Sequence, residues 1–411
     1  MLDRPTLDAD FVRARFPVFA EPTLEGWAFF ENAGGSYPCE PVVRRLGEFY
    51  RRLKVQPYAP YPASEEGGAW MDESRTRLAA WLEVAGDEVH FGPSTSQNSF
   101  VLAQAFRQWL SAGDEIVVTN QDHEANGGVW RRLADDGIVI REWAIDPATG
   151  HLDPDGLDRL LTERTRLVAF PHASNIVAEI NPVAEIAARA HAAGAVVAVD
   201  GVSFAPHGLP DVGALGADIY LFSSYKTYGP HQGVMTVRRE LAERLPNQGH
   251  FFNAGAPTKR LTPAGPDHAQ IAALAGMVDY FEALAEHHGA GGAAPAEKAA
   301  TVREMMRARE SRLVAPLIDY LAGRNDLRLI GPRDPLLRMP TLAVHHARPG
   351  EALAAALAEH RIMAGGGSFY SNRTVEALGI DPGHGVLRLS FLHYTSEAEI
   401  GQLIEALDRV L

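Results

Sequence analysis

A lone lysine, Lys226, stands between two tyrosines in the stretch FSSYKTYGPHQG (222–233), directly after an apolar run. Burying an ammonium group costs several kcal/mol unless the group is paired or neutralised. This position therefore indicates either a snorkelling surface lysine or a site that needs an amine. Desolvation lowers the pKa of a lysine, which makes the neutral amine available to form an imine with an aldehyde.

A carboxylate, Asp200, stands at the tip of another apolar run, AVVAVDG (195–201). Taken alone, a helix cap or a buried ion pair explains it. Pyridoxal phosphate, however, requires a lysine for its aldehyde and an acid opposite its pyridine nitrogen, which keeps that nitrogen protonated. The pair at two strand ends adds a site for this cofactor to the interpretations that stay open, beside the helix cap and the ion pair.

Short apolar runs in the middle of the chain predict the strands that position these groups, and they cover 114–120, 166–172, 195–201 and 217–224. Between the second and third runs, residues 181–194 have helical spacing with a proline at the start and a glycine at the end. This alternation predicts a mostly parallel sheet covered on both faces. Such sheets bind ligands beyond the carboxyl ends of their strands, where His172, Asp200 and Ser223 stand.

The last third of the chain has a different pattern. Long helices are predicted over 267–288 and 298–323, followed by short strands at 327–331, 341–346 and 386–391 with helices between and after them. We predict a large cofactor-binding domain over residues 24–285 and a small α+β domain over residues 286–411. Residues 1–23 are expected to form an N-terminal arm that packs with the small domain.

Composition limits the classes of partner. The net charge of −14 argues against nucleic acid and anionic membranes. No apolar run is long enough for a transmembrane helix, and the N-terminus lacks the apolar core of a signal peptide. The one cysteine, Cys39, excludes an intrachain disulfide and a thiolate metal cluster. We expect a cytoplasmic protein without a metal site.

The segment VDGVSFAPHGLPDVGALGADIYLFSSYKTYGPHQGV (199–234) resembles the cofactor segment of class V aminotransferases, the family that includes the cysteine desulfurases. The resemblance implies an α/β enzyme of fold type I, with a mostly parallel sheet of the seven-stranded type, flanking helices and a smaller α+β C-terminal domain. It also implies that Lys226 carries the internal aldimine of pyridoxal phosphate, and that Asp200 binds the pyridine nitrogen.

Other segments resemble the same family in the expected order and imply the remaining cofactor contacts. FGPSTSQNSF (91–100) resembles the phosphate-binding turn, DHEAN (122–126) the segment whose histidine stacks on the ring, and HASNIVAEINP (172–182) the segment near the phenolic oxygen. The cofactor residues implied are Ser94, Thr95, Ser96, His123, Asn175, Asp200, Ser203, Ser223, Tyr225 and Lys226. Without the resemblance, the serines read as an ordinary helix cap and His123 as a surface residue.

Substrate contacts are implied at the two ends of the chain. FENAGGSYP (30–38) resembles the substrate loop of the family and implicates Asn32 and Ala33, together with Asn175. VLRLSFLHYTS (386–396) resembles the closing strand, whose arginine, here Arg388, grips the substrate carboxylate in a bidentate pair. An exposed arginine on an edge strand is the alternative interpretation.

The chain departs from cysteine desulfurases in three places. The stretch RIMAGGGSFYSNRTVEALGI (361–380) lacks the loop cysteine that would carry a persulfide, and Cys39 reads as a small buried hydrophobe. Tyr225 replaces a frequent histidine. Ser203 replaces a usual glutamine or histidine, so proton handling near the imine is expected to differ.

We therefore predict an enzyme that acts on a small α-amino acid through an external aldimine, with desulfurase-like β-elimination that needs no protein thiol. Lys226 is the general base, and Lys226, Asp200 and His123 are the catalytic residues. Aminotransferase and epimerase chemistry are the alternatives that the sequence leaves open. A homodimer with the active site at its interface is expected. Gly265 stands where relatives place a threonine that reaches the phosphate of the other subunit, and its N–H or His268 is the candidate substitute for that contact.

Three other classes fit less well. A nicotinamide oxidoreductase needs a G-x-G-x-x-G turn after the first strand, and no predicted strand ends in one. A non-catalytic relative is expected to have lost Lys226 or Asp200, and both are present. A metal hydrolase is disfavoured because no H-E-x-x-H spacing occurs among the 16 histidines.

Overall fold

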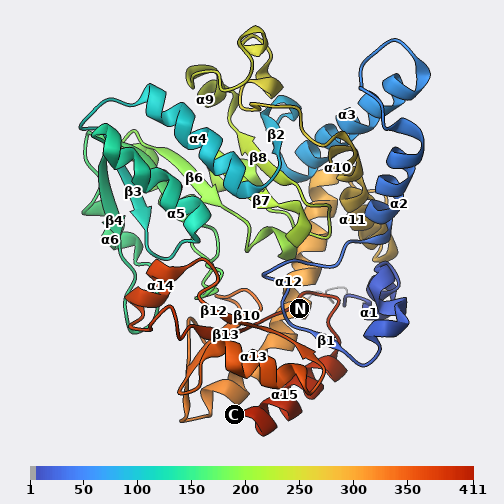
Figure 1. Cartoon of the computed structure of the whole chain (residues 1–411), viewed down its shortest axis with the longest axis vertical. Coiled ribbons are helices and arrows are strands. Elements are labelled where there is room, and N and C mark those ends of the chain that lie inside the picture. The colour runs from blue at the N-terminus through green and yellow to red at the C-terminus, as the bar shows by residue number, and fades with distance from the viewer. Residues whose placement is uncertain (1–5) are drawn as a thin grey trace.

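The computed structural model describes residues 6–411, and its largest element is a seven-stranded sheet (Figure 1). The strand order is β2, β8, β7, β6, β5, β3, β4, and β8 is antiparallel to both its neighbours while the other pairs are parallel. In that order the strands are Val89–Gly92, Gly233–Val237, Ile219–Ser223, Val196–Asp200, Thr165–Pro171, Glu115–Thr119 and Val139–Trp143. The predicted α/β class with a mostly parallel sheet is confirmed.

The predicted strands lie where the apolar runs are, within one or two residues. β6 ends at Asp200 and β7 ends at Ser223, so the two side chains leave the sheet at the carboxyl ends of neighbouring parallel strands. A tight 3-10 turn, Ser224–Lys226, follows β7 and carries the lysine. This placement arises from the strand ends themselves, because parallel neighbours end at the same edge of a sheet.

Each face of the sheet has its own apolar core, because successive strand residues point to opposite sides. On one face, Ile116 and Val118 of β3 pack in a cluster with residues of α4 (Thr95–Trp109) and α5 (Glu124–Arg131). On the other face, Val117 belongs to a larger cluster shared with α3 (Pro62–Leu82), α7 (Val183–Ala192) and α11 (Ala275–His287). The strands are therefore almost continuously apolar, as their sequences indicate.

The C-terminal part builds a smaller antiparallel sheet in the order β12, β13, β10, β9. Its strands are Gly365–Gly367, Val386–Ser390, Thr341–His346 and Leu327–Leu329, and its helices are α13 (Gly350–Ala358), α14 (Asn372–Ala377) and α15 (Glu397–Val410). The N-terminal strand β1 (Ala28–Phe29) pairs with β11 (Ile362–Met363), so the chain start reaches this part of the molecule. Figure 1 shows α12 (Pro295–Ala322) running between the two parts.

The helix predicted over 267–288 is divided into α10 (His268–Ala273) and α11. Ser74 of α3 supplies the reason, because its hydroxyl accepts a hydrogen bond from the Ala275 N–H at 3.0 Å and donates one to Ala272 O at 3.1 Å. A side chain inserted in this way interrupts the i to i−4 ladder of a helix. The other predicted long helix is continuous as α12.

The start of the chain contacts both parts. Arg13 at the end of α1 (Ala9–Arg13) pairs with Glu399 of α15 at 2.8 Å, and Asp8 pairs with His287 of α11 at 2.9 Å. Residues 1–5 of the predicted N-terminal arm lie outside the described residues. The remaining short helices are α2 (Glu40–Glu48), α6 (Pro154–Asp158), α8 (Val212–Leu215) and α9 (Arg239–Arg244). No helix among residues 6–411 is both long and apolar enough to cross a membrane.

Candidate active site

Lys226 lies at the bottom of a cavity at the carboxyl edge of the large sheet. Burial lowers the pKa of its amine from 10.5 to about 8, with a further lowering by the nearby Arg388 guanidinium and an opposing effect of Asp200 and Glu31. An amine with this pKa is a much better nucleophile at neutral pH than an exposed lysine. The side chain is therefore not the snorkelling surface lysine that the sequence also allowed.

Asp200 faces the same cavity from the end of β6. Its Oδ1 accepts a hydrogen bond from the Val202 N–H at 2.9 Å. Burial raises the pKa of the carboxyl, whereas the Val202 N–H and the charge of Lys226 lower it. A buried carboxyl of this kind is stabilised as an anion when a cationic ring nitrogen lies against it.

The N-terminus of α4 forms a third wall of the cavity, and it is built for an anion. Ser94 caps the helix by accepting from the Gln97 N–H at 3.2 Å, and the Thr95 hydroxyl lies 2.7 Å from that of Ser223. The uncapped N–H groups and the helix dipole favour a phosphate at such an end. Gly233 of β8 permits this arrangement, because a Cβ there would lie 2.3 Å from the Ser94 carbonyl carbon.

His123 is the N-cap of α5 and also lines the cavity. Its Nδ1 accepts a hydrogen bond from the Ala125 N–H at 3.0 Å, so the proton of the neutral ring is on Nε2. Burial, with the charges of Lys226 and Arg388, lowers the pKa of His123 to about 4. A neutral imidazole of this kind is suited to stack on an aromatic ring.

The ten residues that the sequence assigned to the cofactor all line this one cavity: Ser94, Thr95, Ser96, His123, Asn175, Asp200, Ser203, Ser223, Tyr225 and Lys226. Tyr225 stacks on His231, with ring centroids 4.5 Å apart. Asn32 and Ala33 border a smaller adjoining cavity that also reaches Lys226 and Ser203. The structure thus brings together residues from six separate segments of the chain.

Arg388 is the predicted site residue that the cavity does not expose. It lies on β13 and is 3% exposed, with the Phe369 ring 3.7 Å from its guanidinium carbon. Glu31 Oε1 accepts from its Nη2 at 2.7 Å, and its Nε is buried without a hydrogen-bond partner among the described residues. The predicted carboxylate site is therefore covered by two of the chain's own side chains.

The segment that carries Phe369 is hydrogen-bonded to Asn175, which lines the cavity. Asn175 donates through Nδ2 to Phe369 O at 3.1 Å and accepts from the Ser371 hydroxyl at 2.8 Å, while the Tyr370 carbonyl accepts from the Glu124 N–H at 2.8 Å. Phe369 and Tyr370 both have positive φ, 53° and 58°, which non-glycine residues rarely adopt. This tight turn lies in the stretch where the sequence lacks the family's loop cysteine.

The sequence interpretation missed Glu31 and Phe369. Glu31 directly precedes Asn32 in the FENAGG stretch of the predicted substrate loop, so a signal was present. Phe369 lies in GGGSFYSN, where the only sequence signal is an aromatic side chain beside three glycines. Neither pairing with Arg388 is visible in the sequence, because Glu31 lies 357 residues away from it and no local pattern joins Phe369 to it.

Cys39 lines neither of the two cavities that Lys226 borders. It is fully buried beside α2, where its Sγ lies 3.5 Å from Gly276 O, and burial raises the pKa of its thiol to about 12. A thiol with this pKa is almost entirely protonated at neutral pH and a poor nucleophile. Among residues 6–411, no three histidine, cysteine or acidic side chains are grouped to hold a metal ion.

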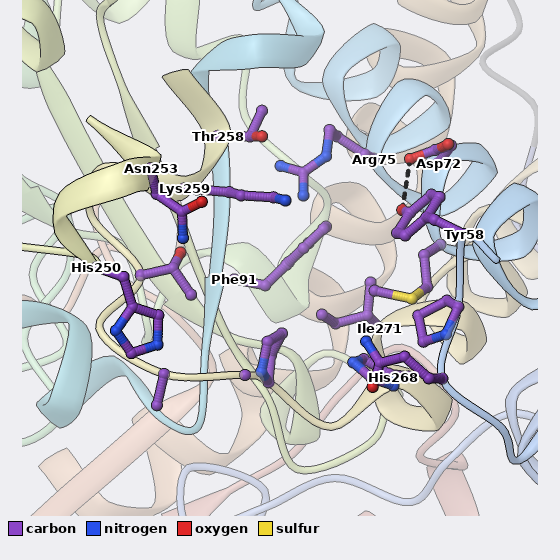
Figure 2. Close-up of a pocket in the computed structure, with 17 residues that line it drawn as sticks. Tyr58, Asp72, Arg75, Phe91, His250, Asn253, Thr258, Lys259, His268 and Ile271 are labelled. Atoms are coloured by element: carbon purple, nitrogen blue, oxygen red, sulfur yellow. Dashed lines mark hydrogen bonds between the residues drawn. The ribbon is translucent and has the colours of Figure 1, made fainter. Parts of the chain in front are cut away.

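A separate, larger cavity of about 530 Å³ lies between β2, α3, α10 and the segment around residues 250–266 (Figure 2). Gly265 and His268 line this cavity rather than the one that contains Lys226. Figure 2 shows Arg75 and Lys259 pointing into it, with Tyr58 hydrogen-bonded to Asp72 at 2.9 Å. In their own chain, the two residues considered for a phosphate contact therefore do not line the cavity that contains Ser94, Thr95 and Ser96.

Comparisons with known proteins give a consistent result. The sequence model of the family described as aminotransferase class-V matches residues 28–403. The aminotransferase-like protein FGM3 of Gibberella zeae is 34% identical and covers 97% of this chain and 98% of its own. A cysteine desulfurase of Yersinia pestis is 33% identical over 66% of this chain and 71% of its own. The solved apo cysteine desulfurase of Thermococcus onnurineus has the same fold, with a TM-score of 0.85 at 23% identity over 97% of both chains.

Proposed function

This chain belongs to the class V aminotransferase family of pyridoxal-phosphate-dependent enzymes, and we propose that it acts on a small α-amino acid by desulfurase-like β-elimination without a persulfide cysteine. The observation that carries the proposal is the single cavity in which the Lys226 amine, the Asp200 carboxyl and the N-terminus of α4 converge. The residues present fit an aldehyde at Lys226, a pyridine nitrogen at Asp200, a stacked ring at His123 and a phosphate at Ser94–Ser96. When bound, pyridoxal phosphate supplies the electron sink that makes the Cα proton of an amino acid acidic.

Lys226 would act as the base that removes this proton. Its pKa of about 8 lets the amine be neutral when it accepts the proton and charged when it returns it, both near physiological pH. Asp200 would hold the positive charge of the ring nitrogen. His123, neutral because of its low pKa, would cover the ring without adding charge.

Arg388 would bind the substrate carboxylate once Glu31 and Phe369 have moved away from its guanidinium. The guanidinium has donors to spare, since Glu31 accepts from Nη2 while Nε has no partner among residues 6–411. The Phe369 turn would need to lift, because its ring lies directly on the guanidinium. While it is closed, the turn keeps bulk water away from the guanidinium.

β-Elimination is favoured over thiol-dependent desulfuration because the nucleophile is lacking. Cys39 is the only cysteine of the chain, and it is buried with a raised pKa. A leaving group expelled from Cβ needs no protein thiol. Transamination is the second candidate, because it uses the same groups and because FGM3, which is similar over almost its whole length, is named aminotransferase-like.

A homodimer is part of the proposal. Phe251 and Phe252, in the segment next to the large cavity, are 87% and 70% exposed, and monomeric proteins rarely leave adjoining aromatic rings in water. Light scattering after gel filtration should give twice the chain mass of 44.6 kDa. Loss of that dimer in the double variant Phe251→Ser/Phe252→Ser would place the interface at this segment. A monomeric wild-type protein would refute the proposed homodimer.

The central test uses the protein loaded with pyridoxal phosphate and a panel of amino acids, with sulfide, pyruvate, ammonia and keto acid measured separately. Release of pyruvate and ammonia that persists in Cys39→Ala supports elimination, whereas keto acid formed only with an amino acceptor supports transamination. Lys226→Ala should lose the visible absorption band of the bound cofactor and all turnover. A wild-type protein without that band would refute the proposal as a whole.

A further inference from the structure

A buried carboxylate behind the active site belongs to no part of the proposed chemistry. Glu310 of α12 is 0% exposed, and its Oε2 lies 2.9 Å from His207 Nδ1. Its Oε1 has no hydrogen-bond partner among the described residues and lies 4.0 Å from His393 Nδ1. A carboxylate in such a place costs several kcal/mol unless neighbouring groups compensate it.

The groups around Glu310 form one connected cluster. His393 is 0% exposed and its Nε2 lies 2.6 Å from the Tyr280 hydroxyl of α11, while the Tyr228 hydroxyl lies 3.3 Å from its Nδ1 and donates to Pro206 O. Arg309, the neighbouring residue, does not pair with Glu310: it donates to the His393 and Thr395 carbonyls at 2.7 Å each and pairs with Glu397 at 3.2 Å. No lysine or arginine of the described chain is within salt-bridge distance of Glu310, so its partners are the two histidines.

Three members of this cluster each follow a residue of the candidate active site in the sequence. His207 follows Asp200 across one loop and a 3-10 turn, Ala205–His207. Tyr228 follows Lys226 in the KTY stretch, and His393 follows Arg388 at the end of β13. The cluster therefore meets the three segments that carry the base, the ring anchor and the carboxylate ligand.

Two further observations link the cluster to the site. His207 and Lys226 border the same small adjoining cavity, so the cluster reaches the wall of the site through His207. Glu310 also sits where α12 passes from one core to the other: Met306 belongs to the core of the large sheet and Leu313 to that of the small sheet. A buried polar group at this junction can fix the position of the small part of the molecule relative to the large one.

We propose that Glu310 is a positioning residue of the active site, which through His207, His393 and the neighbouring Tyr228 anchors the segments of Asp200, Arg388 and Lys226 from behind. The inference rests on the proposed function for the roles of those three residues. The anchoring itself is a property of the chain alone. An anchored segment holds its catalytic group within the small tolerance that rate enhancement requires.

The first experiment tests the anchoring in the cofactor-free protein. It measures the rates of backbone amide hydrogen exchange by mass spectrometry. Glu310→Gln keeps the side-chain shape and removes the charge, and Asp319→Asn, on an exposed position of the same helix, is the matched control. Glu310→Gln should speed exchange in peptides covering 201–208, 226–229 and 391–395, and Asp319→Asn should not. Exchange that is unchanged in those three segments, or that rises uniformly over the chain, would overturn the proposal.

The second experiment reads the consequence in the loaded enzyme. Glu310→Gln should bind pyridoxal phosphate about tenfold more weakly and change the circular dichroism of the bound cofactor per unit absorbance, and Glu310→Asp should recover part of both. A variant that only lowers the melting temperature, with wild-type affinity and dichroism, would show a packing role and refute positioning. If wild-type protein binds no cofactor, the proposed function fails while the exchange result still decides the anchoring.

Tyr280→Phe provides a milder variant should Glu310→Gln not fold. It removes one hydroxyl, the partner of His393, and so loosens the arm that leads to Arg388. We expect KM for the amino acid identified in the panel to rise severalfold, with the affinity for pyridoxal phosphate unchanged. An unchanged KM would contradict the proposed anchoring of Arg388.

Discussion

The amine of Lys226 should titrate far below an ordinary lysine in the cofactor-free protein. Burial and the nearby Arg388 lower its pKa from 10.5 to about 8. At about pH 7.5 these values leave about a quarter of the Lys226 amine neutral, against about 0.1% at the ordinary pKa. The same difference means that the fold disfavours the ammonium by about 3 kcal/mol relative to the amine.

The assay is competitive acetylation of the cofactor-free protein over a range of pH, read by mass spectrometry. The chain has four lysines, Lys54, Lys226, Lys259 and Lys298, so each modified peptide can be resolved. The exposed Lys54 and Lys259 serve as internal standards for reagent and pH. The rate at Lys226 should rise to half its maximum near pH 8, which reports the titration independently of how accessible the amine is.

Two substitutions should move this midpoint in opposite directions. Arg388→Gln removes a cation that disfavours the ammonium, so the pKa of Lys226 should rise. Asp200→Asn removes an anion that favours it, so the pKa should fall. A wild-type midpoint near 10, or both variants shifted in the same direction, would refute the assignment of a buried amine between these two charges.

Three further outcomes follow from the same geometry. Lys226→Met should stabilise the cofactor-free protein by up to about 3 kcal/mol at neutral pH. Because the pKa of Lys226 is lower in the folded protein, the unfolded wild-type chain holds one more proton than the folded one between about pH 8 and 10.5. The stability of the wild-type protein therefore rises across that window, and the stability advantage of the variant shrinks. Urea unfolding at pH 7 and 10.5 checks this. Thr95→Val should weaken pyridoxal phosphate binding about tenfold, measured by fluorescence titration, and leave binding of pyridoxal, which lacks the phosphate, unchanged. Glu31→Gln should lower the KM for the amino-acid substrate about three- to tenfold, because the carboxylate that competes for Arg388 is removed. A raised KM would instead mean that Glu31 orients the arginine.

The strand ends and turns that carry part of the predicted cofactor site follow from local sequence. A buried strand, a polar residue at its end and a tight turn with glycines are contiguous patterns, and they are sufficient to place Asp200, Ser223 and Lys226 at or just beyond strand ends. The capped start of α4 is equally local, since Ser94 bonds the Gln97 N–H within the same turn. Parallel strand order then brings Asp200 and Ser223 to one edge of the sheet, whereas the full set of ten residues was assigned through the resemblance to class V aminotransferases.

The residues that cover Arg388 and the cluster around Glu310 could be identified only in the folded molecule. Glu31 reaches Arg388 from the opposite end of the chain, and Glu310 collects His207 and His393 from either side of its own helix in sequence. The break after Ala273 likewise depends on a serine from α3. These contacts join residues far apart in the sequence, and no periodicity or spacing encodes which distant polar groups will share one desolvated space. Local pattern determined the elements and the groups at their ends, whereas the choice of partner for each buried charge was decided only when the elements packed.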